Sequence, residues 1–87
     1  MEKINVKPKK QPVKFLQAVD NKAFKKLDKA LKGLEKWEGD IKKLAGSSKY
    51  RLKKPPYRLI FEYDKEANTI YVLEINLRGN IDYGRYV

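Results

Sequence analysis

Residues 49–78 read KYRLKKPPYRLIFEYDKEANTIYVLEINLR, and three runs of alternating apolar and polar side chains in this stretch decide the fold. The runs cover residues 49–54, 57–63 and 69–77, and Pro-Pro and the segment DKEAN separate them. Alternation with a period of two is typical of strands, and proline, aspartate and asparagine favour turns. The stretch therefore predicts three consecutive antiparallel strands.

The part of the chain before residue 49 has helical periodicity. Residues 11–19 carry apolar side chains at helical spacing, and residues 21–38 carry a longer apolar stripe of Phe24, Leu27, Leu31, Leu34 and Trp37. A short alternating stretch at 3–7 predicts a first strand, and 40–48 is expected to be a connector. The expected order is β-α-α-β-β-β. This is an α+β fold in which a helical hairpin packs on a small, mainly antiparallel sheet.

Charge and missing residue types narrow the classes of function. The 87 residues, expected to form a single domain over 1–87, include 21 Lys+Arg against 11 Asp+Glu, for a net charge of +10. This excess favours a polyanionic partner, although it also serves solubility. The chain has no cysteine and no histidine, which excludes disulfides, thiolate nucleophiles and histidine acid–base chemistry. Without a phosphate-binding loop, dinucleotide fingerprint or acidic metal cluster, we expect no metal ion or cofactor.

The sequence also indicates where the protein is found. No apolar run comes near the length of a membrane span, and no signal peptide opens the chain. We therefore expect a cytoplasmic protein with no membrane partner.

Strand alternation groups the cations of the three predicted strands on one face of the sheet. Neighbouring residues of a strand point to opposite faces. The apolar set expected to pack beneath the helices is Tyr50, Leu52, Tyr57, Leu59, Phe61, Tyr63, Tyr71, Leu73, Ile75 and Leu77. The opposite face then carries Lys49, Arg51, Lys53 and Arg58, and Arg78 joins them if the alternation continues. Lys54 falls on the apolar side.

This basic face has two interpretations. In the first, it is a phosphate-binding surface, since the planar guanidinium of arginine binds phosphate with two hydrogen bonds. Alternatively, lysines protect an edge strand from aggregation. Glu62 and Glu74 fall on the same face; they orient the cations, or one acts as a base, or the alternation is shifted by one residue.

The C-terminal segment NIDYGRYV, residues 80–87, adds Tyr83, Arg85 and Tyr86. Such tyrosines stack on unpaired bases or donate protons, and they also serve to anchor a chain terminus on the core. The residues alone do not decide between these roles.

Taken together, these motifs resemble the RelE/ParE superfamily of type II toxins, and the RelE-like branch in particular. The resemblance covers nearly the whole chain and is carried by AFKKLDKALKGL, IKKLAGS, YRLK, YRLIFEYD and TIYVLEINLRG. It implies a ribosome-dependent endoribonuclease that cuts messenger RNA in the ribosomal A site. It also implies a cognate acidic antitoxin as partner, with the free toxin a monomer.

The resemblance assigns catalytic roles to Arg51, Lys53, Arg58 and Arg78, and to a C-terminal tyrosine that is Tyr83 or, as the alternative, Tyr86. Residues expected to bind RNA or its phosphates are Lys49, Lys54, Arg85 and Tyr86. Many relatives have a histidine before the last arginine, where this chain reads Asn76-Leu77-Arg78, so histidine-based mechanisms are excluded here.

Two other functions remain open at this point. The first is that of a ParE-like inhibitor of DNA gyrase without nuclease activity, against which the basic face argues. The second is that of a non-catalytic RNA-binding protein or a decayed toxin.

Overall fold

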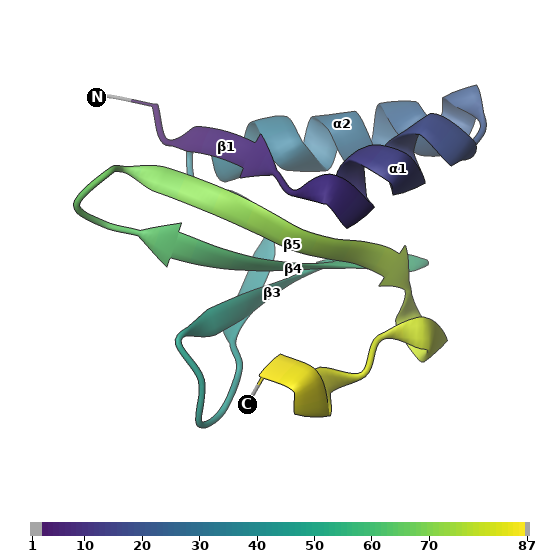
Figure 1. Cartoon of the computed structure of the whole chain (residues 1–87). Helices are drawn as coiled ribbons and strands as arrows, with labels where there is room; N and C mark the ends of the chain where they lie inside the picture. Colours follow the sequence, from purple (N-terminus) through teal and green to yellow (C-terminus); the bar gives the residue numbers. More distant parts are fainter. Residues whose placement is uncertain (1–2, 87) are drawn as a thin grey trace.

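The computed structural model describes residues 3–86 and consists of a helical layer on one face of a sheet (Figure 1). The five strands are β1 (Asn5–Pro8), β2 (Asp40–Lys43), β3 (Lys49–Lys54), β4 (Tyr57–Asp64) and β5 (Thr69–Leu77), in the order β1-β5-β4-β3-β2. Only β1 pairs in parallel, with β5; the other pairs are antiparallel. Helices α1 (Lys10–Ala18) and α2 (Asn21–Leu34) follow β1 and form the hairpin. The predicted α+β architecture is confirmed.

Strand β2 corrects the prediction that residues 40–48 form only a connector. Its four residues, DIKK, contain a single apolar side chain, so they give no alternating signal. The strand exists because it pairs with β3, and because Ile41 packs against the core. Gly39 makes the entry turn with a φ of 126°, and a Cβ there would lie 2.6 Å from Leu52 Cδ1. Both constraints favour glycine.

Helix α2 begins at a well-formed cap and buries a face rotated from the predicted one. The carboxylate of Asp20 accepts a hydrogen bond of 2.8 Å from the backbone N–H of Ala23, as expected for an N-cap. The buried residues of the helix are Ala23, Leu27, Ala30 and Leu34. Phe24, predicted to lie in the stripe, is 43% exposed. Small alanine side chains therefore face the sheet where a phenylalanine was expected.

The C-terminal end of α2 comes at Leu34, earlier than the predicted end at residue 38. The backbone of Trp37 has a φ of 55°, which no α-helix accommodates. The indole packs edge-on against Tyr50 and Phe61, with ring centroids 5.1 and 5.5 Å apart. Trp37 therefore packs beyond the helix end rather than within the helical stripe.

A bulge between β4 and β5 changes which side chains of β5 reach the core. Ile60 pairs with Glu74, but its neighbour Phe61 pairs with Val72, so Leu73 has no partner in the ladder. An extra residue reverses the alternation on either side of it. Ile70 and Val72 therefore belong to the core, while Tyr71, predicted to face the helices, pairs with Glu62 on the other face. The predicted set of core-facing residues in β5 is therefore right only after the bulge, where Ile75 packs in the core.

The outer edge of β5 is completed by a side chain of α1. Strand β1 ends at Pro8, opposite Val72. Further along, the amide of Gln11 donates to the carbonyl of Ile75 and accepts from its N–H, both at 2.9 Å. The Gln11 side chain thus replaces a strand partner at the end of β5 that leads into the candidate site.

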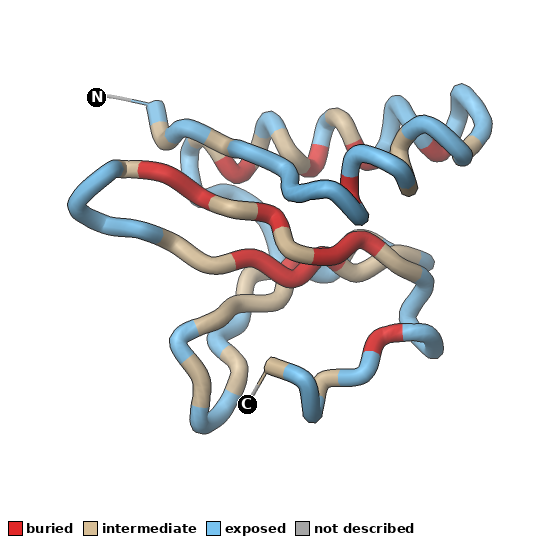
Figure 2. The backbone as a smooth tube through the Cα atoms, in the orientation of Figure 1, coloured by how far each residue is buried: buried red, intermediate tan, exposed pale blue. Residues whose placement is uncertain are grey.

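The core lies between α2 and the central strands, where the buried segments of Figure 2 cluster. Within residues 3–86, no helix is both long and apolar enough to cross a membrane.

We expect Gln11→Ala to lower the free energy of unfolding by roughly 1–3 kcal/mol, because it leaves a buried backbone N–H and C=O without partners. Urea denaturation followed by circular dichroism measures this. Gln17→Ala, at an exposed position of the same helix, should change it by less than about 0.5 kcal/mol. Equal effects of the two variants would contradict the role given to Gln11.

Candidate active site

The candidate site lies on the face of the sheet away from the helices, where three rows of cross-strand neighbours run over β3, β4 and β5. Cross-strand partners project from the same face, so each row brings its side chains together. The rows are Lys53–Arg58–Asn76, Arg51–Ile60–Glu74 and Lys49–Glu62–Tyr71. The structure therefore places Lys49, Arg51, Lys53 and Arg58 on one face, in agreement with the predicted alternation.

Three cations border a surface depression at the β3–β4 turn. The depression has a volume of about 320 Å³, and its lining includes Lys53, Arg58 and Arg78 together with the Pro55–Pro56 turn. Lys53 and Arg78 are exposed and Arg58 is half-buried. Arg78 follows β5 directly, and its backbone N–H is fixed by a hydrogen bond of 3.1 Å to the carbonyl of Pro56. The three cations can thus act on one anionic group held in the depression.

Tyr83 joins this group from the C-terminal segment. The Nη1 of Arg58 donates a hydrogen bond of 3.1 Å to the hydroxyl oxygen of Tyr83. Because the oxygen is the acceptor, the phenolic proton is available for a further acceptor. A cation and a proton donor therefore lie side by side, although 25 residues separate them in the chain.

Arg51 is less accessible than Lys53 and Arg78. Its side chain is 15% exposed, its Nη2 lies 3.6 Å from Asp40 Oδ1, and its Nε is buried without a hydrogen-bond partner. Asp40 is in β2, so this ion pair could not be anticipated while that strand was predicted as a connector. Arg51 contributes positive potential from within the sheet rather than an open guanidinium.

Of the two acids in these rows, Glu74 is nearly buried, with 7% of its surface exposed. Its Oε2 accepts a hydrogen bond of 3.2 Å from the side-chain amide of Asn76, and its Oε1 accepts one from the hydroxyl of Tyr86. Both carboxylate oxygens therefore have partners. Burial, together with the hydrogen bond and charge of Glu74, raises the pKa of Tyr86 to about 12.

The remaining predicted residues lie away from the depression. Lys54 pairs with Tyr57, which packs against the core, so Lys54 is on the helix-covered side. Lys49 lies at the other end of β3, opposite Glu62. Arg85 is exposed on the short 3-10 helix η2 (Tyr83–Tyr86). These residues do not join the group around Arg58.

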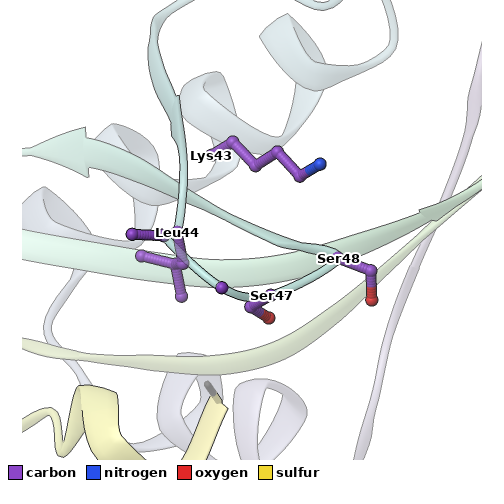
Figure 3. A pocket seen from close by; sticks show the side chains of 6 residues that line it. Lys43, Leu44, Ser47 and Ser48 are labelled. Atoms are coloured by element: carbon purple, nitrogen blue, oxygen red, sulfur yellow. The ribbon is translucent and has the colours of Figure 1, made fainter.

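A second hollow, of about 520 Å³, lies at the β2–β3 turn (Figure 3). Its lining is a single loop, Lys43 to Ser48, and it includes none of the predicted site residues. It adds nothing to the candidate site.

The pKa of Tyr86 gives a prediction for an alkaline titration. A phenol with a pKa raised from 10 to about 12 stabilises the folded state fully below pH 10, and this contribution is lost as the pH rises toward 12. The tyrosinate absorbance of the wild type and of Tyr86→Phe is recorded against pH. The difference between the two curves reports Tyr86 and should therefore have its midpoint near pH 12. A midpoint near pH 10 would mean that Tyr86 ionises as a free phenol.

Comparison with known proteins finds similar solved structures. No protein-family model matches the chain, and neither does any curated protein. Among solved structures, a chain of the archaeal RelE–RelB complex from Pyrococcus horikoshii OT3 matches with a TM-score of 0.75 and 26% identity, over 91% of this chain and 99% of that one.

Two bacterial structures share the fold at lower identity. The toxin–antitoxin complex RelBE2 from Mycobacterium tuberculosis matches with a TM-score of 0.72 and 15% identity, over 92% of this chain and 97% of that one. The intact RelBE toxin–antitoxin complex of E. coli matches with a TM-score of 0.70 and 20% identity, over 85% and 95%. The bacterial structures share the fold of this chain. With 26% identity over 91% of its length to a chain of the archaeal complex, this chain is assigned to the RelE-like toxin superfamily.

Proposed function

We propose that this chain is the toxin of a type II toxin–antitoxin pair, a single domain that cleaves messenger RNA in the ribosomal A site. The observation that carries the proposal is the group of Lys53, Arg58 and Arg78 around one depression, with Tyr83 hydrogen-bonded to Arg58. The similarity to RelE-containing complexes supports the toxin role.

The proposed reaction needs no metal ion or cofactor. The 2′-hydroxyl oxygen attacks the adjacent phosphorus, and the bond from phosphorus to the 5′-oxygen of the next nucleotide breaks. Solvent water accepts the proton of the 2′-hydroxyl. A second proton is delivered to the 5′-oxygen by a side chain that then regains one from solvent. The products are a 2′,3′-cyclic phosphate and a 5′-hydroxyl.

Cations serve this reaction because negative charge gathers on the phosphate oxygens in the transition state. Arg58 and Arg78 hold the phosphate, and each preorganised donor is worth about 3 kcal/mol by analogy with oxyanion-hole deletions. Lys53 stabilises the 2′-oxygen as its proton is lost. Arg51, held by Asp40, adds positive potential from one row away.

Tyr83 is the best-placed proton donor on this face. Its oxygen accepts from Arg58, so its own proton can be directed to the leaving 5′-oxygen. The neighbouring guanidinium stabilises the phenolate that results. Lys49 and Arg85, both outside the depression, would contact more distant parts of the RNA backbone.

Dependence on the ribosome follows from what the chain lacks. With no histidine and with its buried glutamate already hydrogen-bonded, the site holds few groups that exchange protons near neutral pH. Positioning of the reactive bond by the ribosome supplies the orientation that such a site cannot impose alone.

An acidic antitoxin is the second proposed partner. A net charge of +10 attracts an acidic chain, and the similar structures are those of complexes named RelE–RelB and RelBE. Without that partner we propose a monomer.

Arg58→Gln should lower the rate of message cleavage on programmed ribosomes by roughly 100-fold or more, because it removes a preorganised donor to the phosphate. Mapping of message 5′ ends after induced expression measures this in cells. Lys65→Gln, in the exposed β4–β5 turn, removes the same charge far from the depression and should cut like the wild type.

Two results would contradict the proposed function. Cleavage that persists unchanged in Arg58→Gln would exclude the catalytic assignment. Intact messages alongside a loss of DNA supercoiling by gyrase would instead favour a ParE-like inhibitor.

A further inference from the structure

The C-terminal segment, residues 78–86, crosses the face of the sheet opposite the helices (Figure 1). It contains only the 3-10 helices η1 (Arg78–Asn80) and η2. Its internal hydrogen bonds include those from the N–H groups of Gly84 and Arg85 to Asp82, of 3.0 and 3.2 Å. Helices this short do not hold themselves in place, so the position of the segment depends on its contacts with the sheet.

Apolar burial provides the first of these contacts. Ile60 projects from the face away from the helices, in the row of Arg51 and Glu74, yet it is fully buried. Ile81 of the C-terminal segment is 8% exposed. Neither residue belongs to the main core cluster. Arg58 and Glu74, the neighbours of Ile60 on this face, are the residues to which Tyr83 and Tyr86 of the segment are hydrogen-bonded.

A hydrogen-bond network provides the second contact. The hydroxyl of Tyr86 donates to Oε1 of Glu74, and the side-chain amide of Asn76 donates to Oε2. The side-chain oxygen Oδ1 of Asn76 in turn accepts a hydrogen bond of 2.9 Å from the backbone N–H of Leu77. The network thus connects the last turn of the segment to the end of β5. Glu74 is 7% exposed, and a buried carboxylate left without hydrogen-bond partners is costly.

The two tyrosines of η2 are therefore in different states. Tyr83 accepts from Arg58 and keeps its proton available, whereas Tyr86 has its proton committed to Glu74. Only two residues separate them, so fixing Tyr86 restricts where Tyr83 can lie.

We propose that Tyr86 is a positioning residue whose hydrogen bond to the buried Glu74 holds the C-terminal segment on the sheet and keeps Tyr83 beside Arg58. This inference rests on the proposed function, because the reaction that Tyr83 assists belongs to it. It replaces the expectation that Tyr86 contacts RNA directly.

A double-mutant cycle tests the proposal on translating ribosomes. Tyr86→Phe keeps the ring and removes only the hydrogen bond, and it should lower kcat about tenfold, the effect of losing one hydrogen bond to a charged group. In a Tyr83→Phe background the same change should have no further effect, because Tyr86 acts through Tyr83. Tyr63→Phe, which removes the 3.2 Å hydrogen bond to Asn68 at the other end of β4, is the matched control and should cleave normally.

A second measurement needs no RNA. Amide hydrogen exchange at Gly84 and Arg85 should be about tenfold faster in Tyr86→Phe than in the wild type, with exchange in the core strands unchanged. Unchanged exchange at these amides would overturn the proposal. The proposal would also be overturned if Tyr86→Phe lowered kcat by the same factor in the wild type and in Tyr83→Phe, because Tyr86 would then contact the RNA itself.

The two measurements separate this inference from the proposed function. If the wild type cuts no message, the proposed function fails, and the exchange rates still decide whether Tyr86 anchors the segment.

Discussion

The one-residue bulge at Leu73 is the constraint on which both faces of the sheet depend. Ile70 and Val72 pack in the core before it, and Ile75 packs in the core after it. Strict alternation would place Ile75 opposite Ile70, since five positions separate them. The bulge removes this conflict, and it also directs Glu74 and Asn76 to the face of the cations. A straight β5 would have to bury a carboxylate in the main core or expose half of its apolar residues.

The sequence predicts which face of the sheet carries the cations better than it predicts the course of β5, and the bulge explains why. Lys49, Arg51 and Lys53 lie on β3, which pairs with β4 without any shift in register. Arg58 lies on β4 before the shift between β4 and β5, so the bulge does not disturb the alternation of these four residues. Errors arise where the local pattern is weak or broken. Tyr71 was assigned to the wrong face because nothing in a run of apolar residues reveals an inserted one.

Other features depended on tertiary contacts that local patterns do not contain. Strand β2 forms by pairing, and with it Asp40 reaches Arg51. Ala23 is buried on α2 and the neighbouring Phe24 is 43% exposed, which depends on how the helix is rotated against the sheet. The sequence identified Tyr83 and Tyr86 but left both as stacking residues, proton donors or anchors. Their hydrogen-bond partners, Arg58 and Glu74, distinguish them.

A domain of this size has little apolar surface with which to fix a second face of its sheet. Helices cover one face, and the proposed reaction requires that the cations of the other stay accessible to phosphate. Covering that face with a helix would hide Arg58 and Lys53, while leaving it bare would expose Ile60. A short segment attached at Ile81 and Tyr86 satisfies both demands, because it covers Ile60 and leaves the depression beside Arg78 open. The same attachment brings a phenol to the cations, so stability and the proposed chemistry are linked through one buried carboxylate.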